Sequence, residues 1–329
     1  MKKYFVFLFL LIFLLLTENF AQQITPSQFA HTYSIVARDE QTGEIGVAVQ
    51  THWFNVGMRV SWAEAGVGAI ATQSFTNASF GSLGLELLRQ GKSSQEVVDE
   101  LIASDDGRDF RQLAVIDKKG NAAAYTGKKC IQPAGHIVGE NFSVQANLML
   151  NDKVWPAMAE AFKNTKGSLS ERMMATLEAG QNAGGDIRGK QSAAMIIVKG
   201  ESSGKKWEDE VLHLRIADHP EPIKEMRRLL NVQNAYTHMN IGDEAIEKND
   251  FESAEKEYSA AMEIYPENLE IKYWYAVALA NAGKVEESLS LFKDVFSKDE
   301  NWRTLTKRLP DSDLLKVSNE DLNKIISLK

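Results

Sequence analysis

The sequence predicts an α/β (α+β) protein, in which a domain of largely antiparallel sheets and covering helices is followed by an all-α repeat tail. Two observations lead to this fold class. Along residues 32–231 the apolar pattern alternates in the order strands, two helices, strands, two helices, strands. From Ala235 onward the pattern is purely helical, and small and aromatic residues recur after 34 positions, as in a tetratricopeptide repeat.

The predicted strands form hairpins. Segments 33–38 and 46–50 flank the turn-forming sequence Asp-Glu-Gln-Thr-Gly-Glu, and segment 67–74 is a third strand. Further strands are expected at 112–116, 122–126, 142–149, 192–198 and 211–216. Because short turns join strands that run in opposite directions, the sheets should be largely antiparallel.

The predicted helices come in two pairs. The first pair is expected at 82–89 and 94–103, and the second at 153–163 and 170–181. Neither pair can bury its apolar face alone, so each should cover a sheet. Two sheets packed face to face with helices outside satisfy this order, although periodicity alone does not require that arrangement.

The tail, residues 232–329, carries one complete repeat and one degenerate repeat. The first has Gly242, Ala254, Tyr258, Ala261 and Pro266, and a shift of 34 gives Ala276, Ser288, Phe292, Val295 and Glu300. Segment 302–309 is expected to start a capping helix. Two repeats are marginal alone, and the tail is either a structural cap or a groove for a protein partner.

The N-terminus has the layout of a secretory signal peptide. Lys2 and Lys3 precede an apolar run at 4–16, and Ala21 offers a small residue for cleavage. The run is short for a membrane span. We therefore expect a signal peptide at 1–21, a leader or propeptide at 22–31, and export to a periplasm or beyond with no membrane span in the mature protein.

The composition argues against several classes of protein. The chain has 329 residues, a net charge of −8 and an isoelectric point near 5.4, without a lysine and arginine cluster, so no nucleic-acid partner is expected. Six histidines form no closely spaced ligand pair, and the single cysteine, Cys130, excludes a cysteine-based zinc site. Neither a phosphate-binding loop nor a Gly-x-Ser-x-Gly elbow occurs. We expect no metal and no cofactor.

A glycine-rich stretch at 178–194 is the first candidate for a functional site. It ends a helix, enters a strand, and carries Asp186, Arg188 and Ser192 close together. The alternative is a tight helix-to-strand turn with a surface pair between Asp186 and Arg188. Such a turn does not need two adjacent glycines, two opposite charges and a Gln-Ser pair, so we favour a site loop.

Two further polar clusters lie at predicted strand ends. Segment 62–74 finishes with Thr72, Gln73 and Ser74, while Gln145 and Asn147 are two apart on a strand and so share a face. Amide groups can donate hydrogen bonds to a developing oxyanion. The commoner reason for such residues is the hydrogen bonding of a buried strand end.

Four segments together resemble an uncharacterised bacterial family, the domain of unknown function 1028. They are Thr-Tyr-Ser-Ile-Val-Ala-Arg-Asp at 32–39, Trp-Ala-Glu-Ala-Gly-Val-Gly-Ala at 62–69, and the segments 127–135 and 179–194. The resemblance spans about residues 32–230. The family is placed with the N-terminal-nucleophile hydrolases, which implies a four-layer αββα sandwich with two largely antiparallel sheets for residues 32–231.

The mechanism of that superfamily singles out Thr32. A Thr, Ser or Cys is exposed by cleavage as the first residue of the first strand, and its own α-amino group, with a pKa near 8, acts as the base. The resemblance implies Thr32 as nucleophile and Asn147 as a candidate oxyanion donor. Asp186, Arg188 and Ser192 would orient Thr32 or bind a substrate carboxylate.

Substrate binding is assigned to Arg59, Gln73 and Gln145, with Arg59 as the cation where related folds use a lysine. The leader at 22–31 separates the expected signal cleavage from Thr32. If the leader stays attached, Thr32 has no free amine and is an ordinary β-branched strand residue.

These expectations support two functions. The first is an exported hydrolase that cleaves an amide bond in a small amide, a peptide or a cell-wall fragment. The second is a non-catalytic exported protein that binds a ligand in the sandwich and a partner through the repeats.

Overall fold

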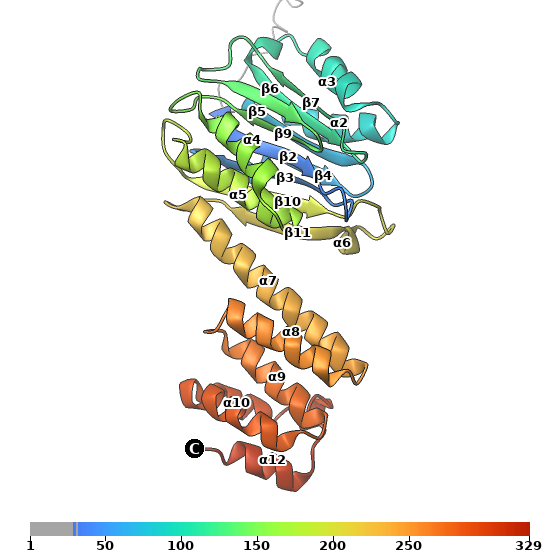
Figure 1. Cartoon of the computed structure of the whole chain (residues 1–329), viewed down its shortest axis with the longest axis vertical. Coiled ribbons are helices and arrows are strands. Elements are labelled where there is room, and N and C mark those ends of the chain that lie inside the picture. The colour runs from blue at the N-terminus through green and yellow to red at the C-terminus, as the bar shows by residue number, and fades with distance from the viewer. Residues whose placement is uncertain (1–28, 31) are drawn as a thin grey trace, which may run out of the picture. The chain divides into compact units, whose positions relative to one another are not determined.

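A computed structural model describes residues 29–30 and 32–329 (Figure 1). The predicted signal peptide and most of the leader lie outside these residues. The chain divides into two compact units at Ile223 and Lys224, within helix α7 (Pro222–Glu247), and each unit is described by itself.

The first unit contains two antiparallel sheets. Sheet A has the order β1-β5-β6-β7, with β4 also paired to β5, and sheet B has the order β11-β10-β3-β2-β9-β8. The strands of sheet A are β1 (Phe29–Ala30), β4 (Ser61–Glu64), β5 (Gly68–Phe75), β6 (Arg111–Asp117) and β7 (Ala122–Thr126). Those of sheet B are β2 (Thr32–Arg38), β3 (Ile45–Thr51), β8 (Gly135–Gly139), β9 (Phe142–Ala146), β10 (Ser192–Val198) and β11 (Glu210–Ile216).

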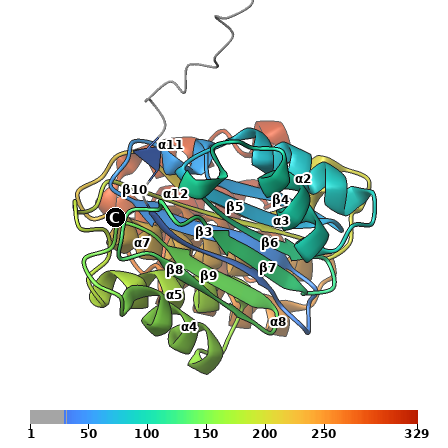
Figure 2. The same cartoon turned by 90° about the horizontal axis from the view of Figure 1, so that it is seen from above.

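Helices cover the outer face of each sheet. Helices α2 (Ser79–Arg89) and α3 (Ser94–Ala103) pack on sheet A, while α4 (Val154–Asn164) and α5 (Leu169–Asn182) pack on sheet B. Figure 2 shows the strands between these two pairs. The short helices η1 (Val56–Met58), η2 (Arg108–Phe110) and α6 (Lys206–Asp209) lie in connections. The four-layer αββα prediction is confirmed.

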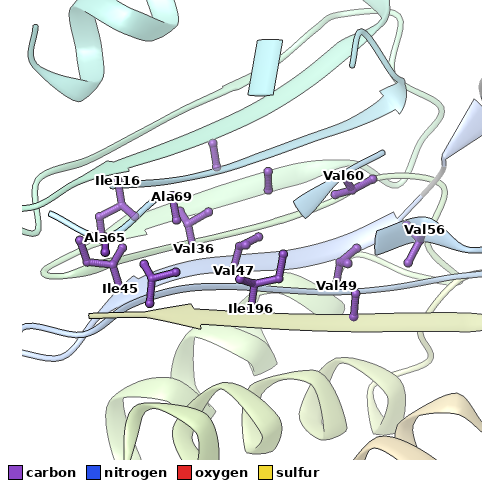
Figure 3. Packing of buried hydrophobic residues seen from close by; sticks show 14 residues of the cluster. Val36, Ile45, Val47, Val49, Val56, Val60, Ala65, Ala69, Ile116 and Ile196 are labelled. Atoms are coloured by element: carbon purple, nitrogen blue, oxygen red, sulfur yellow. The ribbon is translucent and has the colours of Figure 1, made fainter. Parts of the chain in front are cut away.

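The inner faces of the sheets pack through small and branched side chains. Sheet B contributes Val36, Val47 and Val49, and sheet A contributes Ala69 and Ala71, all fully buried (Figure 3). Because side chains alternate between faces, these positions also fix which other residues point inward. Towards the start of β2 the inward positions become polar, and this change locates the candidate site.

Some element boundaries differ from the prediction. The strand expected at 142–149 stops at Ala146, and Leu148 has a left-handed φ of 58° that an extended strand does not allow. Strands β4 and β8 were not predicted. Both strands have five residues or fewer, and β8 has a glycine at each end. The alternation of apolar and polar residues is therefore too short in either strand to indicate a strand from the sequence.

The second unit is a helical repeat. After α7 come α8 (Phe251–Ile264), α9 (Leu269–Asn281), α10 (Val285–Lys298), α11 (Glu300–Thr306), η3 (Pro310–Ser312) and α12 (Asn319–Ile326). The predicted core positions of both repeats are buried: Ala254, Tyr258, Ala261, Ser288, Phe292 and Val295. A Cβ on Gly242 would lie 2.9 Å from the Tyr258 ring, so glycine lets α7 and α8 approach. No helix in the described part of the chain is long and apolar enough to cross a membrane.

Candidate functional site

Thr32 begins β2 on its inner face and is fully buried. Thr32 is in register with Thr51 on β3, and Thr51 is in register with Ser192 on β10. Three hydroxyl side chains therefore lie in one row across three neighbouring strands, which are spaced about 4.8 Å apart. Strand β1 belongs to sheet A, whereas β2 belongs to sheet B.

The carbonyl oxygen of Thr32 is held by amide groups. It accepts hydrogen bonds from the backbone N–H of Asn147 at 3.0 Å, from Asn147 Nδ2 at 3.4 Å and from Gln73 Nε2 at 3.2 Å. Two predicted site residues thus fix the start of β2 from opposite sheets. The strand predicted at 142–149 would include Asn147. In the structure Asn147 directly follows Ala146, the last residue of β9, and makes this contact from outside the strand.

Gln73 belongs to a buried chain of hydrogen bonds that joins both sheets. Ser143 Oγ donates to Gln145 Oε1 at 3.1 Å, and Gln145 Nε2 donates to Ser34 Oγ at 2.6 Å. Ser34 Oγ in turn donates to Gln73 Oε1 at 2.6 Å, and Gln73 Nε2 donates to Gln112 Oε1 at 2.6 Å. All five of these side chains are fully buried. Buried amides are costly unless paired, and here each is paired.

Gln112 is the centre of this network. Its Oε1 also accepts from Asn147 Nδ2 at 2.9 Å. Its Nε2 donates to Thr126 Oγ1 at 2.9 Å, to the Ala146 carbonyl at 2.9 Å and to the Gly135 carbonyl at 3.2 Å. We call Ser34, Gln73, Gln112, Thr126, His136, Ser143, Gln145 and Asn147 the amide network.

His136 closes the amide network at the edge of sheet B. Its Nδ1 lies 2.8 Å from Thr126 Oγ1, which already accepts from Gln112. When the neutral ring accepts the Thr126 proton at Nδ1, it carries its own proton on Nε2. Burial lowers the pKa of His136, which favours this neutral form.

Acidification is expected to weaken the domain through His136. Because its pKa is lowered in the folded state, the unfolded chain binds more protons between that value and about 6.5. The stabilising contribution is fully present above about pH 6.5 and is lost as the pH falls through the folded pKa. Urea unfolding at about pH 7.5 and about pH 5 should show a larger loss of stability for wild type than for His136→Gln. An equal loss in both would contradict the assignment.

Asp186 and Arg188 form an ion pair beside the hydroxyl row. The buried Asp186 carboxylate accepts from Arg188 N at 2.9 Å, Nε at 3.0 Å and Nη2 at 2.7 Å, and from the backbone N–H of His52 at 3.1 Å. Gly185 and Gly189, with φ of 60° and 116°, shape this loop. Burial, and next the Asp186 charge, raise the pKa of Tyr33. The hydrogen bond from His52 therefore holds this loop against the end of β3, one residue after Thr51.

Ser192 supports the same strand ends. Its Oγ accepts from the backbone N–H of Val56 at 3.1 Å and donates to the carbonyl of Trp53. Both contacts hold the connection that follows β3. Ser192 is thus brought to the hydroxyl row while its proton is directed away from Thr32.

Arg59 and Cys130 stay outside the amide network. Arg59 is exposed after η1, and its carbonyl accepts from Trp62 Nε1 at 3.1 Å. Cys130 is buried, and burial raises its pKa, although the Ser74 hydroxyl lowers it. A buried thiol with a raised pKa is a poor nucleophile. Among the described residues, no group of three or more His, Cys, Asp or Glu side chains could hold a metal ion.

Sequence reasoning missed several members of the site. They are Ser34, Thr51, Gln112, Thr126, His136 and Ser143. The available signal was strand alternation: Gln112 shares its face with Ala114 and Ile116, and Thr51 shares its face with Val49. Polar residues on an otherwise apolar inward face mark this end of the sandwich.

Comparison with known proteins identifies both units. The model of a family of unknown function, DUF1028, matches residues 32–226, and a tetratricopeptide repeat model matches residues 245–309. No curated protein matches the chain. A crystal structure of protein SPO2555 from Silicibacter pomeroyi, described with the same family model, matches at 32% identity. The match covers 60% of this chain and 84% of that chain, with a TM-score of 0.56.

A second solved structure is far weaker. Anbu (ancestral beta-subunit) from Yersinia bercovieri is 13% identical, over 60% of this chain and 92% of that chain, with a TM-score of 0.30. This likeness carries no argument about fold or activity. On its match to the family model over residues 32–226, the chain belongs to the DUF1028 family.

Proposed function

We propose that the α/β unit is an exported amide-bond hydrolase with Thr32 as an N-terminal nucleophile. One observation carries the proposal: Thr32 starts an inner strand with its side chain between the sheets, and amides from both sheets fix its carbonyl. An apolar core fills the same layer further along the strands. At the first residue of β2, buried polar side chains thus replace the apolar core.

Cleavage of the bond between His31 and Thr32 would create the reactive group. The new α-amine would take the proton from Thr32 Oγ1 as the oxygen attacks the substrate carbonyl carbon. The amine would return this proton to the leaving nitrogen, and water would hydrolyse the ester that remains. Strand β1, which precedes this bond, pairs with sheet A through two residues only, at the edge strand position beside β5.

The neighbouring residues have positioning roles in this proposal. Asn147 and Gln73 hold the Thr32 backbone, and Gln145 supports Gln73 through Ser34. Asn147 Nδ2 already contacts Gln112 and Thr32, so it reaches an oxyanion only by giving up the longer contact to Thr32. The Asp186–Arg188 pair and Ser192 fix the strand ends around the hydroxyl row.

The N-terminus of the mature protein tests the proposal. When the full chain is produced in an exporting host, intact mass and N-terminal sequencing should show Thr32 as the first residue. Periodate should then convert the terminal amino alcohol to an aldehyde, a reaction that an internal threonine does not undergo. A mature chain that starts at Gln22 would lack the amine base, and the hydrolase proposal would fail.

The repeat unit favours a second function. The tetratricopeptide match at 245–309 lies in a compact unit of its own, and such repeats commonly bind proteins. A non-catalytic protein would bind a ligand in the sandwich and a partner through the repeats. Deletion of residues 235–329 should then abolish capture of a defined partner and leave binding of the sandwich ligand intact.

A further inference from the structure

An open cleft lies at the end of the sandwich away from Thr32. Its volume is about 1180 Å³, and it is bordered by four turns. These turns are 38–44 between β2 and β3, 64–67 between β4 and β5, 118–119 between β6 and β7, and 198–210 between β10 and β11. The amide network contributes no residue to this cleft.

Arg38 is an inward-facing arginine at this end. Thr32 is the first residue of β2 and Arg38 the last, and alternation places Arg38 on the inner face opposite Ile45 of the apolar core. Its Cδ lies 3.4 Å from the point where a Cβ on Gly120 would stand. The stem is therefore covered by the turn between β6 and β7, while the guanidinium borders the cleft.

The Arg38 guanidinium has no protein partner within the described part of the chain. Its Nε is buried and makes no hydrogen bond, and no carboxylate pairs with the group. A half-buried arginine normally gains a carboxylate or carbonyl partner, because desolvation of its charge is otherwise uncompensated. Arg38 and Lys119 also border a smaller cavity of about 400 Å³.

Cationic side chains border the cleft from both sheets. Five of those lining it form no ion pair among the described residues: Arg38, Lys118, Lys119, Lys199 and Lys206. Of the carboxylates lining it, Glu64 pairs with Arg89 at 2.8 Å. The others are Glu40, Glu44, Glu201, Asp209 and Glu210, so the opposite charges are equal in number, but within the described residues none of these carboxylates pairs with Arg38.

We propose that this cleft binds a small, multiply charged anion, with the Arg38 guanidinium as its main ligand. The planar guanidinium offers paired donors that match a phosphoryl or carboxylate group. Lysines from both sheets supply further charge around it. The site is separate from Thr32 and does not depend on amide hydrolysis.

Calorimetric titration of the purified full chain tests this site at low ionic strength. Pyrophosphate probes phosphoryl anions and citrate probes carboxylates. Wild type should bind at least one probe saturably, and the stronger probe identifies the chemistry. Arg38→Met should weaken binding about tenfold or more, while Lys166→Gln, an exposed lysine between α4 and α5, should change it less than about twofold.

Stability supplies a second readout. Arg38→Met removes a buried, unpaired Nε and keeps the apolar stem, so the melting temperature without anion should be unchanged or higher. The rise in melting temperature with added anion should disappear. If Arg38→Met does not fold, Lys119→Gln provides the same test with a loss of about threefold. Failure of both probes to bind wild type, or an equal loss in Lys166→Gln, would overturn the proposal.

Discussion

Replacing Thr32 with alanine is expected to abolish amide hydrolysis while the fold is retained. The change removes the only atom that can attack the substrate carbonyl in the proposed reaction, so kcat/KM should fall by about 10⁴-fold or more. Thr32→Ser keeps the hydroxyl and should retain measurable activity. The measurement is kcat/KM on whichever compound of an amide and dipeptide panel wild type hydrolyses.

A matched control separates chemistry from packing. Thr176 is also fully buried, and its hydroxyl donates to the Arg172 carbonyl at 2.8 Å within helix α5, which covers the outer face of sheet B. Thr176→Ala removes the same atoms and should leave kcat/KM within about twofold of wild type. If Thr32→Ala hydrolyses amides like wild type, or if wild type hydrolyses none of the panel, the proposed nucleophile is wrong.

The order of elements could be predicted because each depends on local periodicity. The hairpin at 33–50 and the helix at 94–103 each show their apolar period within a single segment, and the structure has both. The tail could be predicted because Tyr258 and Phe292 repeat at fixed spacing. Strand ends such as Ala146 depend on single backbone angles, which periodicity does not encode.

The candidate site could be predicted only in part. Gln73, Gln145 and Asn147 stood out as polar residues at strand ends, but their contacts depend on how two sheets face each other. Ser34 donates to Gln73 across 39 positions of sequence, and no local pattern relates the two. Gln112 was passed over because both faces of its strand are otherwise apolar, so it looked like the first residue of a buried strand.

Loss of Gln112 is expected to cause a large loss of stability in the α/β unit. Gln112→Ala removes the shared acceptor of Gln73 Nε2 and Asn147 Nδ2, which keep only longer contacts to the Thr32 carbonyl. It also removes the side-chain donor to the carbonyls of Ala146 and Gly135, which are partners across β8 and β9. Each buried polar group that loses a partner costs about 1–3 kcal/mol, and entry of water offsets part of the sum, so we expect a loss of about 3–5 kcal/mol.

The measurement is urea unfolding of the full chain at neutral pH, with fluorescence and circular dichroism recorded together so that the two units are resolved. Gln95 provides the control, because its exposed side chain donates only to Asp99 at 2.9 Å and Gln95→Ala should change stability by less than about 0.5 kcal/mol. Gln112→Leu fills most of the volume but restores no hydrogen bond, so it should recover only the cavity part of the loss. If Gln112→Ala stays within about 1 kcal/mol of wild type, the amide network does not hold the two sheets together, and the buried amides around Thr32 would need another explanation.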